Sequence, residues 1–471
     1  MTINRRTLTI FSLTMITVGS VDSIRNLPTT ALFGSQLIVF FVLGALFFLI
    51  PTALISAELA SGWPKQGGIY IWVREAFGKK AGFLAIWLQW IENVIWYPTI
   101  LSFVAGTVGY WINPELANNA YFLWSVIVIS FWGVTWINLC GMTASAWFSN
   151  ICTIVGLLMP MSLIIILGAI WITSGSHLQI SLDMHSILPK FNDSSMWVSL
   201  TAIMLSFCGI EIATVHANDI ENPREAFPKA LIYSVLIILI TLILGSLSIA
   251  VVLPAHQINL VAGIMQAFDA FFKHYHLSFI MPVIAIMLVM GGLGSVSNWI
   301  IAPVKGLLVA AEDGNLPPYF RSTNSNGAPV VMLIGQAAVV TLLATVFLFM
   351  PSVNGSYWIL TALAAQLYML MYLLMFITAI KLRFKAPQQV RVFRVPGGII
   401  GLILVAGTGI IGTCLTLMVS FIPPIGINVG NLDYYALILL SGLIVLCAIP
   451  MIIGRLQRKC HEIQSIISIT N

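Results

Sequence analysis

Two short polar stretches interrupt segments of the chain that are otherwise apolar. Residues 18–23 contain Gly19, and residues 206–211 contain Gly209. An unwound turn in a membrane helix exposes backbone N–H groups at one half-helix and C=O groups at the other, so it can hold a carboxylate and an ammonium. An α-amino acid carries both groups on one carbon. The pair of breaks therefore predicts an amino acid site, although helix packing would explain either glycine alone.

Three ionisable residues lie at or near these breaks, and a fourth, Glu92, lies in the middle of the apolar segment 81–110. Charge at membrane depth is costly and usually functional. For Glu211, a structural role in holding the break, substrate binding and proton uptake all stay open. Asp22 and Arg25 either pair with each other, or Arg25 faces an outer vestibule and attracts anions. Glu92 lies one helical turn before Trp96, which favours a role towards substrate or protons.

A third element that could face the same site is the segment with Ser295, Asn298 and Trp299, which share one helical face. Trp299 either closes over a substrate or packs with its N–H satisfied. We expect the backbone at the two breaks to bind the α-carboxylate and α-ammonium, and the side chains to shape the rest of the pocket. The predicted substrate-binding residues are Val18, Gly19, Ser20, Asp22, Ser23, Arg25, Glu92, Trp96, Ser206, Cys208, Gly209, Glu211, Ser295, Asn298 and Trp299.

The composition requires that these residues be positioned by membrane helices. Hydrophobic residues make up 59% of the 471 residues and charged residues 8%, whereas a soluble domain carries roughly 25% charged residues. Runs near the roughly 20 residues that cross a bilayer recur along the chain. The predicted spans are 7–32, 35–61, 81–110, 120–140, 146–173, 196–218, 228–253, 279–311, 329–350, 356–381, 399–421 and 433–454.

The basic residues predict the orientation of these spans. Of the 21 Lys and Arg residues, all but Arg25, Lys190 and Lys273 fall on the side of the amino terminus. The positive-inside rule then places both termini in the cytoplasm of a multi-pass protein of the inner (plasma) membrane.

The two breaks lie five spans apart, so the interrupted helices run in opposite directions. This spacing predicts a five-plus-five inverted repeat with two added helices, as in LeuT-like transporters. The first repeat covers residues 1–173 and the second 196–381, followed by two additional helices in 399–454 and a short cytoplasmic tail in 455–471.

Enzymatic and nucleic-acid functions find no support in the motifs. The chain has no Gly-rich phosphate loop, no zinc-ligand spacing and no Ser/His/Asp set, so we expect no catalysis, cofactor or metal. The cysteines fit small buried hydrophobes. The expected partners are small-molecule amino acids, protons and the lipid bilayer, with a monomer sufficient for function.

Several motifs, taken in order, resemble those of the amino acid–polyamine–organocation (APC) superfamily of secondary transporters. They are residues 57–59 (AEL), 63–73 (WPKQGGIYIWV), 207–211 (FCGIE), Asn222 with Pro223, and 310–317 (AAEDGNLP). The chain is most similar to the glutamate/γ-aminobutyrate antiporter group, through residues 209–216 (GIEIATVH), 247–254 (LSIAVVLP), 298–303 (NWIIAP) and 393–398 (FRVPGG).

The resemblance implies a LeuT-like fold and the exchange of small amino acids or their decarboxylated products by alternating access. The chain differs from that group at Asp22 and Arg25 in the first break, at Ser295, where an acid would be expected, and at the extra acid Glu92. Its tail is too short for a cytoplasmic plug. Two other functions stay open, a proton-coupled uptake symporter of a zwitterionic or cationic amino acid, and a substrate sensor without flux.

Overall fold

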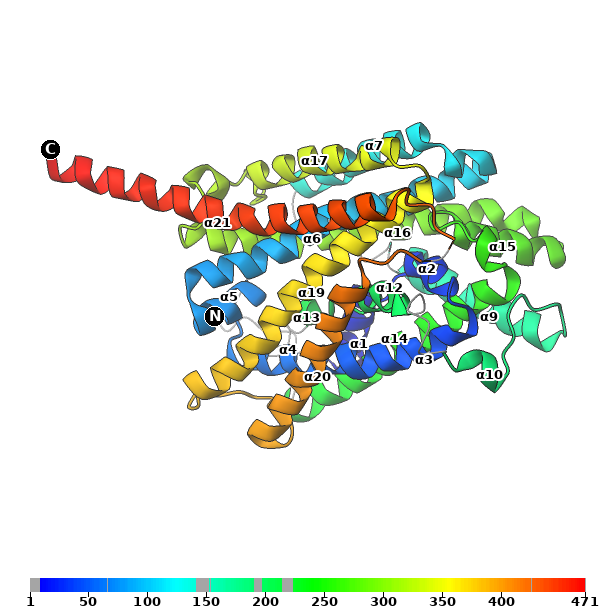
Figure 1. Cartoon of the computed structure of the whole chain (residues 1–471), viewed down its shortest axis with the longest axis horizontal. Helices are drawn as coiled ribbons and strands as arrows, with labels where there is room; N and C mark the ends of the chain where they lie inside the picture. Colours follow the sequence, from blue (N-terminus) through cyan, green and yellow to red (C-terminus); the bar gives the residue numbers. More distant parts are fainter. Residues whose placement is uncertain are drawn as a thin grey trace.

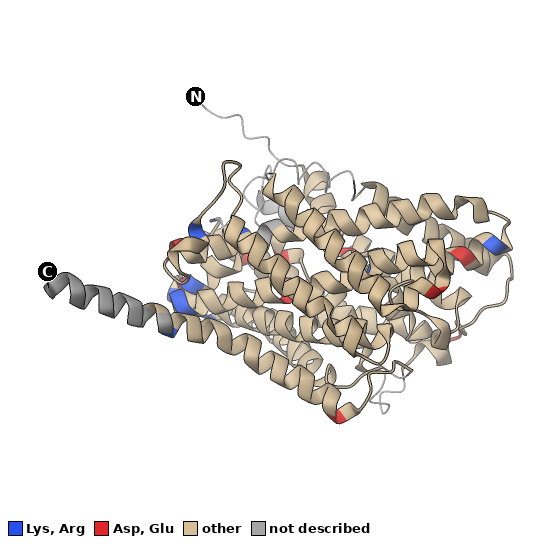
Figure 2. Ribbon diagram, turned by 90° about the horizontal axis from the view of Figure 1, so that it is seen from above, with Lys and Arg blue, Asp and Glu red and all other residues tan. Residues whose placement is uncertain are grey.

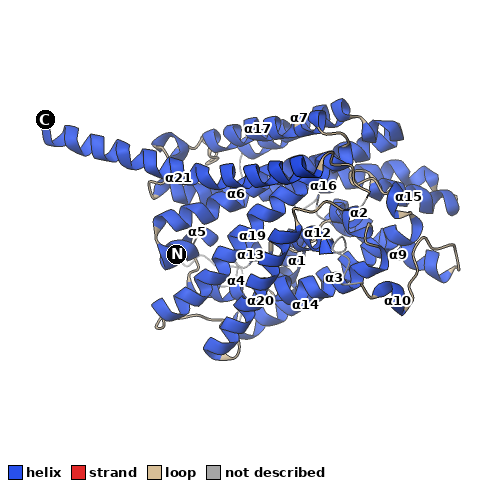
Figure 3. Ribbon diagram, in the orientation of Figure 1, coloured by secondary structure: helices blue, strands red, loops and turns tan. Residues whose placement is uncertain are grey.

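The protein is built from helices throughout the part that the structure describes. The computed structural model describes residues 9–65, 67–140, 152, 154–189, 197–213, 223–424 and 426–470, and all regular elements in these ranges are helical (Figure 3). The helices are α1 (Ile10–Val21), α2 (Leu27–Ala31), α3 (Leu37–Gly44), α4 (Ile50–Gly62), α5 (Ile69–Phe77), α6 (Lys79–Ile112), α7 (Ala120–Leu139), α9 (Met159–Thr173), α10 (Met184–Ile187), α12 (Ser199–Ser206), α13 (Ile210–Ala213), α14 (Pro223–Val252), α15 (Gly263–His274), α16 (Met281–Glu312), α17 (Val330–Ala344), α18 (Val346–Phe349), α19 (Val353–Lys385), α20 (Gly398–Val419) and α21 (Leu432–Thr470).

Long apolar helices are the main structural unit, because a helix satisfies its backbone hydrogen bonds internally where no water is present. Within the described ranges, nine helical stretches are long and apolar enough to cross a membrane, and each coincides with a predicted span. The other three predicted spans are the two interrupted helices and α6, which has 34 residues. The prediction of an all-helical membrane protein is therefore confirmed.

The centre of the molecule is formed by α6, which packs against both α16 and α19 (Figure 1). In α19, 72% of the most apolar 18-residue window is buried inside the protein, whereas in α21 only 11% is buried. Helix α19 is thus an inner helix, and α21 lies at the periphery, where its apolar side chains suit contact with lipid.

Both predicted helix breaks are present. Helix α1 ends at Val21, and Asp22 and Ser23 adopt extended backbone conformations before a short 3₁₀ turn leads into α2. Helix α12 ends at Ser206, and Gly209 takes a φ of +110° before α13 begins. Glycine tolerates that conformation because it has no Cβ.

The structure adds helical segments outside the predicted spans. Helices α5 and α15 lie between predicted spans, and α21 continues into the predicted tail as far as Thr470. Both α5 and α15 are short and amphipathic. Such helices lie along a surface, so a search for continuous apolar runs does not detect them.

Basic residues gather at one end of the molecule, the end from which α21 extends (Figure 2). We call this the basic end and define it by Arg74, Lys79, Arg383, Lys385 and Arg391. It contains two clusters of charge that fasten helices together.

The first cluster joins α5 to the end of α16. Asp313 accepts hydrogen bonds of 2.5 Å from both the Tyr70 hydroxyl and the Arg74 guanidinium. Partial burial opposes ionisation of Asp313, but the bonds from Tyr70 and Arg74 prevail and hold the pKa of this carboxyl below its usual value.

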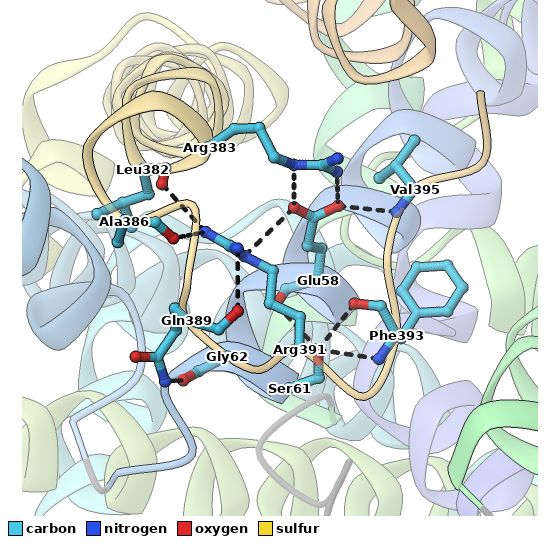
Figure 4. A network of polar contacts seen from close by, with 10 residues as sticks. All are labelled: Glu58, Ser61, Gly62, Leu382, Arg383, Ala386, Gln389, Arg391, Phe393 and Val395. Atoms are coloured by element: carbon cyan, nitrogen blue, oxygen red, sulfur yellow. Dashed lines mark hydrogen bonds and ion pairs between the residues drawn. The ribbon is translucent and has the colours of Figure 1, made fainter. Parts of the chain in front are cut away.

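The second cluster is centred on the buried Glu58 of α4 (Figure 4). Arg383 binds both carboxylate oxygens, at 2.9 and 2.5 Å, and the Arg391 Nε lies 3.6 Å from Oε1. The backbone N–H of Val395 donates to Oε2 at 2.7 Å. One carboxylate therefore connects α4 to the end of α19 and to the loop that follows it.

The same loop is held to α4 by neutral groups on either side of Glu58. Ser61 exchanges two hydrogen bonds with the backbone of Phe393, and the Gln389 side chain donates to the carbonyl of Gly62 at 2.7 Å (Figure 4). Neutralising Glu58 alone would thus leave several contacts in place, but the buried Arg391 and the partly buried Arg383 would lack their counter-ion.

Candidate functional site

A cavity lies where the two broken helices meet, and its volume is about 460 Å³ when the part open to solvent is included. Helices α6, α16 and α19 complete its wall. The lining residues are Gly19, Ser20, Val21, Asp22, Ser23, Arg25, Asn26, Glu92, Asn93, Trp96, Leu205, Cys208, Ser295, Trp299 and Tyr368.

The two breaks approach each other most closely at Gly209. A Cβ atom built there would lie 2.8 Å from the carbonyl oxygen of Ser20 and 2.7 Å from the ring of Trp299. The backbone N–H of Gly209 donates to the Tyr372 hydroxyl at 3.0 Å. Gly209 therefore allows the two breaks to come into close contact, and its own N–H is already bonded to Tyr372.

Glu211 is held by three side chains rather than exposed in the cavity. It accepts hydrogen bonds from the Tyr368 hydroxyl at 2.7 Å, the Tyr372 hydroxyl at 2.5 Å and the Gln89 amide at 3.1 Å. Because Tyr372 also accepts from Gly209, its hydroxyl connects the glycine to the carboxylate. Of the roles open for Glu211, this arrangement favours steadying the break.

Arg25 turns away from Asp22. Its Nη1 donates to the Thr99 hydroxyl at 2.7 Å and to the Tyr357 hydroxyl at 3.2 Å, and its guanidinium lies over the Trp96 ring at 5.0 Å. The ion pairs found among the described residues include no pair between Arg25 and Asp22. Arg25 is also 2% exposed, so it lies in the protein interior rather than in an open vestibule.

Two buried carboxylates line the same cavity. Glu92 accepts a hydrogen bond from the Asn93 side chain at 3.0 Å, and Asp22 lies in the first break. Neither forms an ion pair within 4 Å in the part of the chain that the structure covers. The cavity thus brings together one cationic and two acidic side chains, none of which is in ion-pair contact with another described residue.

An aromatic wall closes one side of the cavity. The rings of Trp96 and Trp299 lie 5.8 Å apart with a tilt of 49° between their planes. Trp299 is partly exposed and lines the cavity, beside Ser295 on the same helix. This placement agrees with a ring that covers a ligand, the first of the two readings of Trp299.

The structure brings ten of the fifteen predicted site residues to the cavity. Val18, Ser206, Gly209 and Glu211 lie behind the lining, and the side chain of Asn298 lies outside the described part of the structure. The predicted site residues did not include Val21, Asn26, Asn93, Leu205 and Tyr368, of which Tyr368 stood out in the sequence only as a weaker candidate. Asn93 and Val21 are sequence neighbours of predicted residues, so their omission reflects the uncertainty of helical phase near a break. In the searched ranges, no group of three His, Cys, Asp or Glu could hold a metal ion.

Comparison with known proteins shows what kind of molecule this site belongs to. Residues 8–444 match the family model described as amino acid permease. An uncharacterized transporter of Legionella pneumophila is 43% identical over 98% of this chain and 99% of the relative. A glutamate/gamma-aminobutyrate antiporter of Lactococcus lactis is 31% identical over 97% of this chain and 92% of its own. A probable agmatine/putrescine antiporter of the same species is 24% identical over 79% and 78%.

The fold and the cavity are those of a multi-pass membrane transporter. The chain belongs to the amino acid permease family, within the superfamily that the sequence motifs resemble. The predicted family is therefore confirmed, and the relatives are named as transporters rather than enzymes.

Proposed function

We propose that this protein is a secondary active antiporter that exchanges amino acids, or amino acids for their decarboxylated amines, by alternating access. The observation that carries this proposal is the crossing of two broken helices at Ser20 and Gly209 beside a cavity with buried charge. Broken helices at matching places in two halves of a chain are typical of transporter substrate sites. The names of the Lactococcus lactis relatives support glutamate and γ-aminobutyrate as the first substrates to test.

In this proposal, the backbone of residues 18–23 and 206–209 binds the α-ammonium and α-carboxylate of the substrate. Helix α1 ends at the cavity, and the carbonyl end of its dipole suits an ammonium. Trp96 and Trp299 cover the substrate's side chain, while Glu211 keeps the second break in place. Because the Gly209 N–H is engaged by Tyr372, we assign to Gly209 close contact rather than donation.

The membrane arrangement is part of the same proposal. Residues 1–173 and 196–381 form the two inverted repeats, with two further helices in 399–454. The basic end faces the cytoplasm, as the positive-inside rule requires for an inner membrane protein. A monomer contains the whole cavity and is sufficient for transport.

Counterflow in proteoliposomes tests exchange directly. Vesicles are preloaded with one unlabelled amino acid or amine, and the uptake of the same compound in labelled form is followed. Accumulation of glutamate and γ-aminobutyrate supports the proposal, and accumulation of neutral or cationic compounds alone would replace that substrate pair. Absence of counterflow with every amino acid and amine would refute an exchange function.

A proton-coupled uptake symporter is the second candidate, because two buried carboxylates, Asp22 and Glu92, line the cavity. Carboxylates at membrane depth often carry protons in transporters. Uptake into vesicles without internal substrate, driven by an imposed pH gradient, would favour the symporter. An obligatory exchanger shows no such uptake.

A further inference from the structure

A buried arginine lines the cavity with no described acidic group within 4 Å, and Glu92 of the same cavity attracts it only from farther away. Arg25 is 2% exposed, and the ion pairs of the described residues do not include it. At the basic end, by contrast, the partly buried Arg383 and the buried Arg391 share the carboxylate of Glu58. Burying a cation without a counter-ion in contact is unfavourable, even after the protein relaxes. A ligand that supplies an anion would offset this cost.

The guanidinium is fixed in position before any ligand arrives. Thr99 and Tyr357 accept from Nη1, and the Trp96 ring lies against the guanidinium plane. Its Nε has no hydrogen-bond partner among the residues that the structure describes. A planar guanidinium with an open donor matches the geometry of a carboxylate, which accepts from two N–H groups at once.

We propose that Arg25 determines substrate specificity by binding a carboxylate at the far end of the substrate, away from the groups held by the helix breaks. This inference rests on the proposed function and names its substrate class. The substrates would be amino acids or amines that carry a carboxylate at the end opposite to the group held by the helix breaks. The two acids of the cavity would instead favour a cationic group, but one Glu92 oxygen already accepts from Asn93, and Asp22 lies in the first break, where the proposed function places the α-ammonium. The open donor of Arg25 makes the anionic end the better match.

Binding to purified protein tests the role of Arg25 separately from exchange. Labelled glutamate and glutamine are compared because they differ only in the charge of the far end. We expect wild-type protein to prefer glutamate, and Arg25→Gln to lower the glutamate-to-glutamine affinity ratio by about tenfold or more, as expected for a charge-assisted hydrogen bond. Arg25→Lys keeps the positive charge but lacks the paired N–H donors of the guanidinium, so it should lower the ratio less.

Lys273→Gln is the matched control, because it removes an exposed cation and should leave the ratio unchanged. A wild-type protein that binds glutamine as tightly as glutamate would overturn the assignment. So would an Arg25→Gln protein that binds either compound and keeps the wild-type ratio. An Arg25→Gln protein that binds neither compound would also overturn a specificity role, because Arg25 would then be required for all binding. This outcome counts only if the variant elutes as a monodisperse peak and unfolds at the wild-type temperature.

Counterflow by the wild type reports separately on exchange. Glutamate-selective binding without counterflow refutes the antiporter and keeps the role of Arg25.

Discussion

Substitution of Gly209 by alanine tests whether close approach of the two helix breaks is essential for transport. Two features of the structure oppose a side chain here. The φ of +110° lies in a region that residues with a Cβ rarely adopt, and the new methyl group would meet the Ser20 carbonyl at 2.8 Å and the Trp299 ring at 2.7 Å. Neither the rigid backbone of Ser20 nor the packed indole can move without changing the cavity.

The expected cost follows from these two terms. A residue forced into a sparsely populated backbone region costs of order 1–3 kcal/mol, and overpacking a well-packed interior costs typically 1–3 kcal/mol more. Their sum is about 2–6 kcal/mol in the conformation with the breaks in contact. Since about 1.4 kcal/mol corresponds to a factor of ten, we expect Gly209→Ala to lower the rate of counterflow at least about tenfold, and Gly209→Val to lower it further.

The assay is counterflow with equal amounts of reconstituted protein, and thermal unfolding in detergent monitors the fold. Gly335→Ala in α17 is the matched control, because a Cβ built at Gly335 meets no atom within 4 Å. This variant should transport at the wild-type rate. A well-folded Gly209→Ala protein with a rate within about twofold of wild type, less than 0.5 kcal/mol, would refute the reasoning that the breaks must touch.

Three further predictions concern the groups that hold the framework. Tyr372→Phe should lower counterflow more than Tyr368→Phe does, because the Tyr372 hydroxyl binds two groups of the second break and the Tyr368 hydroxyl one; equal effects would contradict this difference. Glu58→Gln should lower the unfolding temperature by an amount that matches about 3–5 kcal/mol, since it breaks a buried ion pair. Glu75→Gln, at a more exposed pair, should change stability by about 1 kcal/mol or less, and similar losses in both variants would contradict the burial argument. The pKa of Asp313 is lower in the folded protein, so its contribution to stability is present above the ordinary value of about 4 and is lost as the pH falls below it. Asp313→Asn should therefore weaken the dependence of the unfolding temperature on pH in that range, and an unchanged dependence would argue against the role of this carboxyl.

The spans and the two breaks could be predicted from the sequence because they depend on composition. The bilayer sets the length of an apolar run, and glycine with polar neighbours inside such a run marks a local departure from helix. Helices α5 and α15 could not be found in this way, since an amphipathic helix on a surface has no long apolar run.

The partners of the site residues could not be predicted, because they come from distant parts of the chain. Arg25 binds Thr99 and Tyr357, which lie 74 and 332 positions away. The spacing of Asp22 and Arg25 suggested a local pair, but residues three apart face each other only while the helix continues. The extended backbone at Asp22 and Ser23 removes that geometry.

The distribution of satisfied and unsatisfied charge separates framework from site. Glu58 has two arginines and a backbone N–H, and Glu211 has three side-chain donors, so these two acids are compensated within the protein. Asp22, Arg25 and Glu92 lie in one cavity, and none of them forms an ion pair with another described residue. A framework gains nothing from uncompensated buried charge, whereas a zwitterionic substrate can supply opposite charges to it. The sequence places all five ionisable residues within predicted spans, and only their contacts in the structure distinguish the two arrangements.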